Sequence, residues 1–372
     1  MRITAVLLGL FSFVAVADPC PTRASWPTDG WPVQLVDQTA KRAAIDDLET
    51  FAFTLTGKDS ERLGVRTDSL LIFKRGTLIY ERYARGFDAD KPHLAWSATK
   101  SVSSVLIGVA LHQGLLSLDD SICKHVPEAE KTGHCSVTVK HLITFSSGMK
   151  WQEEYENASY QVSSVISMFY GAGHRDQLAH ILSHPIVGTP GVTWLYSTGD
   201  AQLASLVAKR ALEAKHGKDA FWTQLFDRIG LSKLVLEEDV KGMPQGGSSS
   251  YATPRDFAKF GFFFLSDGCW NGERLVPENW VKQSTTPSDA YVATKPVEPR
   301  PSGFSWWLNR PVADRPKPWP DVPEDAYAAS GYWGQRLIVI PSEDVLIVRF
   351  GDDRKGAIDT NGLIKRALEV AR

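Results

Sequence analysis

Residues 97–113, SATKSVSSVLIGVALHQ, form the stretch around which the rest of the chain is organised. The stretch is mostly apolar, and Gly114 follows it directly, which is typical of a helix that ends at a glycine. It opens with Ser97-Ala98-Thr99-Lys100, so a serine and a lysine stand three residues apart. Because residues i and i+3 share a helix face, the Lys100 side chain can reach the Ser97 hydroxyl.

The Ser-x-x-Lys pattern occurs three times, so the pattern alone carries little information. The copy at Ser121 lies in a cysteine-containing loop, and the copy at Ser147 has a glycine inside the motif. Only Ser97 opens a long apolar helix. A serine hydroxyl becomes a good nucleophile when a base takes its proton, and a buried lysine with a lowered pKa can be that base. On this segment alone, a helix N-cap is the alternative role for Ser97.

Strand-like runs lie on both sides of this helix, far apart along the chain. Residues 69–73 and 78–84 are joined by a Lys-Arg-Gly turn and predict one hairpin, and residues 336–340 and 345–350 predict another. Helices are predicted mainly between the two hairpins, at residues 164–170, 176–183, 200–216, 220–229 and 253–266, with further helices at 38–55 and 356–371 and a short strand near 304–308.

This order of elements predicts an α+β fold in which one antiparallel sheet is built from both termini and flanked by helices. The middle of the chain is then an inserted, mainly helical domain. We expect residues 18–96 and 301–372 to form the sheet domain and residues 97–300 to form the helical domain. A cleft between the two is the expected place for a functional site.

The first residues resemble a secretory signal peptide. Met1-Arg2 is positive, residues 3–16 are apolar, and Ala15-Val16-Ala17 fits a small-x-small cleavage pattern. We therefore expect residues 1–17 to be removed near Ala17 and the product to be exported, periplasmic or secreted, with no membrane anchor. A buried first helix is the alternative.

Composition and cysteine content agree with an exported globular protein. The chain has 372 residues and a net charge of −2, which provides no electrostatic field for nucleic acid. Four cysteines are an even number for an oxidising compartment, and their spacing does not suggest zinc. Because Cys123 and Cys135 bracket a short polar segment, we expect them to pair; a bond between Cys20 and Cys269 stays open.

Two further motifs could join the Ser97 segment. Tyr196-Ser197-Thr198-Gly199 precedes a helix, and its tyrosine could relay a proton, although a core tyrosine is the alternative. Gly331-Tyr332-Trp333-Gly334-Gln335 enters a strand, where glycines let a ligand approach the backbone, although a simple strand start is the alternative. The chain has no G-x-S-x-G, P-loop or G-x-G-x-x-G motif, which argues against an α/β-hydrolase and a nucleotide enzyme.

Taken together in this order, the three motifs resemble the serine β-lactamase and penicillin-binding protein superfamily. The closer resemblance is to class C-like serine hydrolases, which include carboxylesterases and 6-aminohexanoate-dimer hydrolase. Further matching stretches are residues 141–148, 190–197 and 246–251, with Arg255-Asp256, and the similarity runs from about residue 69 to residue 350.

The resemblance implies a β-lactamase-like fold and an acyl-enzyme mechanism that needs no metal or cofactor. Ser97 would be the nucleophile, Lys100 its base and Tyr196 the proton relay, which also helps to activate the deacylating water. The backbone N–H groups of Ser97 and Gln335 would form the oxyanion hole. Substrate would be bound by Thr198, Tyr332, Trp333 and Gly334.

Two positions depart from the family pattern. Thr198 stands where class C β-lactamases carry an asparagine that binds the substrate amide, and Tyr332-Trp333-Gly334 replaces Lys-Thr-Gly. A literal Lys-Thr-Gly at residues 131–133 lies outside the expected order, and we interpret it as a coincidence. Glu153 with Asn157 also lies in the wrong order for a class A deacylation pair, and we interpret it as part of a solvated acidic loop.

These observations predict an exported serine hydrolase that cleaves small-molecule esters or linear amides. We expect aromatic side chains to line the cleft, among them Tyr332 and Trp333, together with Trp151 or Tyr170. A β-lactamase or DD-peptidase is the alternative enzyme, and a catalytically idle, penicillin-binding-like ligand-recognition module is the alternative of another class. The natural acyl group and the oligomeric state stay open.

Overall fold

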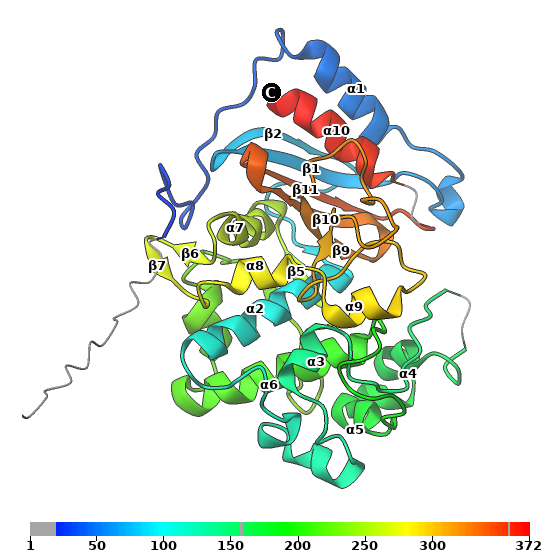
Figure 1. Ribbon diagram of the computed structural model, residues 1–372. Coiled ribbons are helices and arrows are strands. Elements are labelled where there is room, and N and C mark those ends of the chain that lie inside the picture. The colour runs from blue at the N-terminus through cyan, green and yellow to red at the C-terminus, as the bar shows by residue number, and fades with distance from the viewer. Residues whose placement is uncertain (1–19, 157–158, 356–357) are drawn as a thin grey trace, which may run out of the picture.

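The computed structural model describes residues 20–156, 159–355 and 358–372 (Figure 1). The predicted signal peptide therefore lies outside the described residues, as does Asn157. Within the described ranges, no helix combines the length and the apolar character needed to cross a membrane.

A six-stranded antiparallel sheet forms the upper half of the molecule in Figure 1. Its strand order is β2-β1-β11-β10-β9-β8. The bounds are Thr67–Lys74 for β1, Thr77–Tyr83 for β2, Trp307–Leu308 for β8, Tyr327–Gly331 for β9, Gln335–Ile340 for β10 and Val345–Gly351 for β11. β1 pairs directly with β11, with Ile72 opposite Ile347, so the two ends of the chain meet in the centre of the sheet. The predicted α+β fold with a sheet built from both termini is confirmed.

Alternating side chains of β1 give the sheet two buried faces. Leu70 and Ile72 pack into a core beneath α1 (Arg42–Phe53) and α10 (Thr360–Ala371). Leu71 and Phe73 pack into the larger core on the other face, with α7 (Pro254–Leu265). Figure 1 shows α1 and α10 above the sheet and α7 below it.

The remaining helices lie below the sheet in Figure 1, around α2 (Thr99–His112). A short 3₁₀ turn, η2 (Trp96–Ala98), leads into α2, and every residue from Thr99 to Ala110 is buried. A helix buried all round needs apolar residues on every side, which explains the unbroken apolar sequence. α2 packs along α6 (Thr198–His216).

Shorter helices and strands complete this part. They are α3 (Val139–Ile143), α4 (Ser164–Tyr170), α5 (Gln177–Leu182), α8 (Trp280–Ser284) and α9 (Asp289–Thr294), with small sheets from β3 (His93–Leu94), β4 (Val235–Leu236) and β5 (Ser250–Ala252), and from β6 (Cys269–Trp270) and β7 (Glu273–Arg274). The helix expected at 220–229 is a π-helical segment at Trp222–Phe226. The division into two domains stays a prediction.

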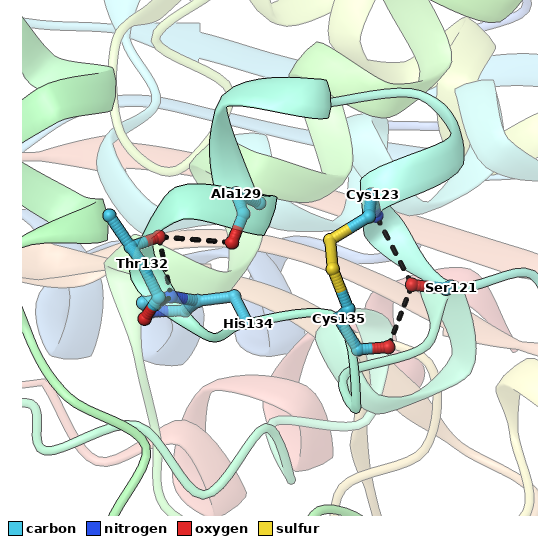
Figure 2. The surroundings of a disulfide bond; sticks show 6 residues. All are labelled: Ser121, Cys123, Ala129, Thr132, His134 and Cys135. Carbon is cyan, nitrogen blue, oxygen red and sulfur yellow. Dashed lines mark hydrogen bonds between the residues drawn. A yellow bond between two sulfur atoms is a disulfide. The ribbon is translucent and has the colours of Figure 1, made fainter.

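Two disulfide bonds tie the chain together. Cys123 and Cys135 are bonded as predicted, with their Cα atoms 5.2 Å apart, and Ser121 donates to the Cys135 carbonyl beside them (Figure 2). The Thr132 hydroxyl of the literal Lys-Thr-Gly is used inside this loop, where it donates to the Ala129 carbonyl. A second bond joins Cys20 to Cys269 and thereby fixes the start of the described chain against β6.

Candidate active site

Ser97 and Lys100 lie together at the start of α2, as the i, i+3 spacing predicts. Ser97 is in the η2 turn and Lys100 is in the first turn of the α-helix. The Lys100 Nζ atom lies 3.1 Å from the Ser97 Oγ atom. The two side chains therefore need no rearrangement to exchange a proton.

The Lys100 ammonium is enclosed by protein. Its side chain is 2% exposed, and Nζ also donates to the Thr198 hydroxyl at 2.9 Å and to the Gly247 carbonyl at 2.6 Å. Burial lowers the pKa of Lys100 to about 8. The negative charge of Glu153 acts in the other direction and raises this pKa, but its effect is smaller. An appreciable share of neutral amine is then present near neutral pH, as a general base requires.

Tyr196 completes the group from the residues just before α6. Its ring lies against Lys100, with Nζ 4.8 Å from the ring centroid, and stacks on Trp307 at 5.5 Å. Burial raises the pKa of the Tyr196 phenol, while a hydrogen bond with the Ser97 side chain acts in the opposite direction. Tyr196 is therefore a protonated phenol that lines the same cavity as Ser97 and lies against Lys100, which suits a proton relay.

The third motif forms a tight turn between β9 and β10. Trp333 and Gly334 both have left-handed backbone conformations, with φ of +57° and +93°. A Cβ atom on Gly334 would lie 2.3 Å from the Arg349 guanidinium. Only glycine satisfies both the backbone conformation and the space at position 334.

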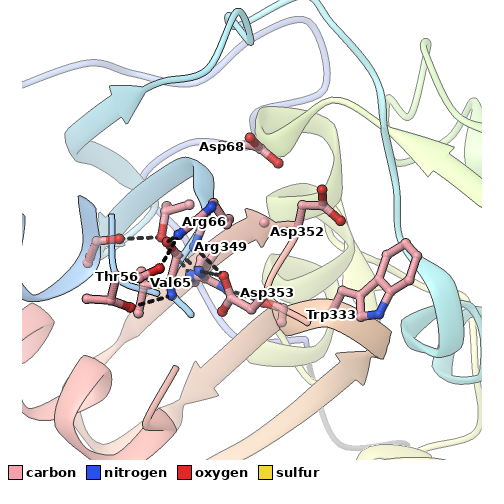
Figure 3. Close-up of polar contacts among 12 residues, drawn as sticks. Thr56, Val65, Arg66, Asp68, Trp333, Arg349, Asp352 and Asp353 are labelled. Carbon is pink, nitrogen blue, oxygen red and sulfur yellow. Dashed lines mark hydrogen bonds and ion pairs between the residues drawn. The ribbon is translucent and has the colours of Figure 1, made fainter. Parts of the chain in front are cut away.

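The buried ion pair between Arg349 and Asp353 fixes the backbone of this turn through hydrogen bonds (Figure 3). Arg349 donates to the Gly334 carbonyl at 2.8 Å and to the Asp353 carboxylate at 2.8 Å, and the Asp353 N–H donates to the Trp333 carbonyl. In a planar trans peptide the C=O and the next N–H point in opposite directions. By holding the Gly334 carbonyl, Arg349 therefore directs the Gln335 N–H to the opposite side.

The Gln335 side chain is engaged within the sheet and is not offered to a ligand. Its amide donates to the Gly351 carbonyl at 2.7 Å and accepts from the Gly351 N–H at 3.0 Å. Position 335 can therefore offer only its backbone, as the predicted role requires. Arg349 and Asp353 are not among the predicted site residues, although an arginine in the apolar run Val-Leu-Ile-Val-Arg-Phe is a signal for a buried ion pair.

A cavity of about 570 Å³ opens in front of Ser97, and aromatic side chains dominate its walls. Its lining includes Ser97, Trp151, Trp194, Tyr196, Trp307, Tyr332, Trp333 and Gly334. A neighbouring cavity of about 650 Å³ shares Tyr155, Tyr332 and Trp333 with it. Of the two alternatives expected in the cleft, Trp151 lines it, whereas Tyr170 lines the neighbouring cavity and is largely exposed.

The interpretation of Glu153 as a solvated acidic residue is wrong. The carboxylate accepts the Thr198 N–H at 2.9 Å and the Trp151 indole N–H at 2.5 Å, and also accepts the hydroxyls of Thr198 and Tyr155. Glu153 thus lies next to the partners of Lys100. No local sequence signal was available for this role, because the contact with Thr198 joins residues 45 positions apart.

Arg336 brings an unpaired cation to the edge of the cavity. Its side chain lines the cavity, yet its guanidinium donates to the Gly331 and Gln335 carbonyls and to the Thr360 hydroxyl on α10. No carboxylate in the described part of the chain lies within ion-pair distance of it. Nearby, Arg300 is paired with Glu298 at 2.7 Å and stacks over Trp307.

Known proteins resemble this chain along most of its length. The chain is 21% identical over 287 residues to a 6-aminohexanoate-dimer hydrolase of Paenarthrobacter ureafaciens, covering 70% of this chain and 72% of that protein. Among solved structures, a putative 6-aminohexanoate-dimer hydrolase from Bacillus anthracis superimposes with a TM-score of 0.68 at 18% identity, over 95% of this chain and 88% of that one.

A family VIII carboxylesterase superimposes with a TM-score of 0.63 at 16% identity, over 91% of this chain and 97% of that one. At such identities the superpositions establish the fold alone. The family model described as Beta-lactamase matches residues 27–371, which is nearly the whole chain. On this match, the protein belongs to the Beta-lactamase family of hydrolases.

Proposed function

We propose that this protein is an exported serine hydrolase that cleaves small-molecule esters or linear amides through an acyl-enzyme intermediate. The observation that carries the proposal is the buried Lys100 amine 3.1 Å from the Ser97 hydroxyl, with Tyr196 packed against both. This arrangement supplies a nucleophile, a base of suitable pKa and a proton relay at one point.

In acylation, neutral Lys100 takes the Ser97 proton while Ser97 Oγ attacks the carbonyl carbon of the substrate. The negative charge on the carbonyl oxygen is stabilised by the N–H groups of Ser97 and Gln335. The bond to the leaving group then breaks, and the proton passes from Lys100 through Tyr196 to the departing alcohol or amine. In deacylation, water attacks the ester, loses a proton through the same groups, and the proton returns to Ser97 Oγ.

Esters and linear amides are favoured over β-lactams and peptidoglycan peptides by the third motif. Tyr332 and Trp333 replace the Lys-Thr of the family pattern, so aromatic surface faces the cavity where a lysine would bind a carboxylate. The names of the similar proteins, an aminohexanoate-dimer hydrolase and a carboxylesterase, support the same substrate classes. The idle-module alternative is disfavoured because Ser97, Lys100 and Tyr196 lie together.

Export is part of the proposal. The two disulfide bonds support an oxidising compartment, in agreement with the apolar N-terminal sequence. N-terminal sequencing of the protein recovered from the periplasm or medium tests it, with a start near Asp18 expected. Recovery of the full-length chain from the cytoplasm alone would contradict export.

Covalent labelling tests the chemistry. A fluorophosphonate probe should attach to Ser97 of the wild type, as read by peptide mapping, and Ser97→Ala should lose both labelling and hydrolysis of p-nitrophenyl butyrate. Ser121→Ala is the matched control, because Ser121 belongs to a Ser-x-x-Lys copy but bonds only within the disulfide loop. Hydrolysis that survives in Ser97→Ala would overturn the proposal.

A further inference from the structure

The Glu153 carboxylate and the Lys100 amine are joined through one hydroxyl group. Thr198, at the start of α6, is 1% exposed, and its Oγ1 atom lies 2.9 Å from Lys100 Nζ. On its other side the same hydroxyl bonds to Glu153, which also accepts the Thr198 backbone N–H at 2.9 Å. Glu153 is partly buried and is anchored by Trp151 and Tyr155 as well.

The direction of these bonds follows from counting protons. An ionised carboxylate only accepts hydrogen bonds, so the single Thr198 hydroxyl proton is donated to Glu153. Thr198 Oγ1 then faces Lys100 as an acceptor. The Gly247 carbonyl, 2.6 Å from Lys100 Nζ, is also an acceptor only.

The protonated Lys100 amine has three N–H groups and three neighbours: Ser97, Thr198 and Gly247. When the amine loses one proton, its lone pair needs a neighbour that can donate. Gly247 has no proton to give, and the Thr198 proton is already held by Glu153. Ser97 is the neighbour that remains, so the lone pair faces the hydroxyl that it must deprotonate.

We propose that Glu153 is a positioning residue, which through the Thr198 hydroxyl points the lone pair of the Lys100 base at Ser97. The inference rests on the proposed serine-hydrolase function. Glu153 also lines the cavity, and the role proposed for it is exerted through Thr198 and Lys100. The inference also explains why a threonine is present at position 198. Its hydroxyl donates to the Glu153 carboxylate and so can only accept from the Lys100 amine.

Charge acts alongside orientation. Glu153 raises the pKa of Lys100 against the effect of burial. The other titratable groups that face this cluster are Tyr155 from the Glu153 loop, Tyr196 from the segment before α6 and Asp200 from α6, with Glu298 and Arg300 beyond Tyr196. Glu153→Gln therefore has two expected effects. The lone pair of Lys100 is less firmly directed at Ser97, and the pKa of Lys100 is lower.

The first test compares Glu153→Gln with Glu154→Gln, whose exposed side chain is the matched control. A glutamine amide can donate to Thr198 Oγ1, which frees the Thr198 proton to compete with Ser97 for the lone pair. We expect kcat for p-nitrophenyl butyrate to fall by about tenfold or more in Glu153→Gln with KM nearly unchanged, and the acid limb of the kcat profile to move to lower pH. Glu154→Gln should match the wild type.

The second test uses Thr198. Thr198→Ser keeps the hydroxyl and should keep kcat within about threefold, whereas Thr198→Val should lose about as much as Glu153→Gln. Because both residues act through one hydroxyl, the double variant Glu153→Gln/Thr198→Val should lose little more than Thr198→Val alone. A merely structural role for Glu153 predicts a lower melting temperature with an unchanged acid limb and no rescue by serine.

Fluorophosphonate labelling separates this inference from the proposed function, because the labelling rate reports the nucleophilicity of Ser97 with any substrate class. If wild-type Ser97 is not labelled, the proposed function fails. If the wild type is labelled and folded Glu153→Gln is labelled at the same rate with the same pH dependence, the positioning role is overturned while the function stands. Equal kcat losses in Thr198→Ser and Thr198→Val would also overturn it.

Discussion

The Arg349 guanidinium lies 2.8 Å from the Asp353 carboxylate, and both side chains are completely buried. Further hydrogen bonds support the pair: Arg349 donates to the Thr67 hydroxyl, and the Arg66 N–H donates to Asp353 Oδ1 at 2.6 Å, whereas Asp353 Oδ2 is buried without a hydrogen-bond partner in the described part of the chain. Burying two charges is costly even when they are paired, so stability alone is a weak reason for this arrangement. Its contact with Gly334 gives it a second role, which is to orient the peptide that carries the Gln335 N–H.

Arg349→Met should therefore affect stability and activity through separate causes. It leaves Asp353 buried without its partner, which should lower the free energy of unfolding by about 3–5 kcal/mol in guanidinium chloride titrations. It also releases the Gly334 carbonyl, and loss of one oxyanion donor typically lowers kcat by about 10²–10³-fold.

The double variant Arg349→Met/Asp353→Asn distinguishes the two effects. It removes the unpaired charge and should recover a measurable part of the stability, but kcat for p-nitrophenyl butyrate should stay low because Gly334 still lacks its donor. Wild-type kcat in the double variant would show that the turn holds its shape without Arg349.

Activity should rise with pH through the titration of Lys100. The amine acts as a base only when neutral, and its pKa is lowered to about 8. The specificity constant kcat/KM for p-nitrophenyl butyrate should therefore rise about tenfold per pH unit well below pH 8 and level off above it. Lys100→Arg, which keeps a charge but provides no base at these pH values, should be slower by about 10²–10⁴-fold.

Asp200 is the necessary control for this profile, because burial raises its pKa to about 7 and it lies in the first turn of α6. If Lys100 controls the acid limb, Asp200→Asn keeps an apparent pKa near 8. An acid limb that disappears in Asp200→Asn would assign the titration to that carboxyl group instead.

Gly334 should not tolerate a methyl group. Gly334→Ala places a Cβ atom against the Arg349 guanidinium in a left-handed backbone, so the turn must shift and kcat should fall by at least about tenfold. Gly272 has a similar φ of +79° but open space around its Cβ position. Gly272→Ala should thus cost about 1–2 kcal/mol of stability from backbone strain with kcat unchanged. Equal kcat in both variants would show that the contact with Arg349 is unimportant.

The sequence predicted the parts of the site that depend on local spacing. Ser97 and Lys100 share one helical turn, so their contact follows from i, i+3 geometry alone. Tyr196 was found by the order of the motifs. Glu153 was missed because its contact with Thr198 joins residues 45 positions apart, and nothing in a local pattern distinguishes a buried carboxylate from a solvated one.

Strand β9 was missed for a steric reason. Its residues Tyr-Ala-Ala-Ser-Gly contain no β-branched side chain, so the usual strand signal is absent. The strand needs small residues because it passes against the η2 turn: a Cβ atom on Gly331 would lie 2.1 Å from the Ala95 carbonyl oxygen. The close packing that brings the third motif to Ser97 thus requires small side chains, and small side chains do not give the β-branched pattern by which a strand is predicted.

The third motif should also determine substrate choice. p-Nitrophenyl butyrate should have a higher specificity constant than nitrocefin, because Tyr332 stands in the third motif where a lysine would bind the β-lactam carboxylate, and Trp333 beside it offers an apolar face. A charge-assisted hydrogen bond contributes about 1.5–3 kcal/mol, or roughly ten- to a hundredfold in kcat/KM, and an ester without a carboxylate loses nothing by its absence. Arg336 is the cation that could compensate, but the Gly331 and Gln335 carbonyls and the Thr360 hydroxyl already engage its guanidinium. We therefore expect Arg336→Gln to change the two specificity constants by the same factor. A higher constant for nitrocefin in the wild type, together with a selective loss of nitrocefin turnover in Arg336→Gln, would instead identify Arg336 as a carboxylate-binding residue and make the protein a β-lactamase.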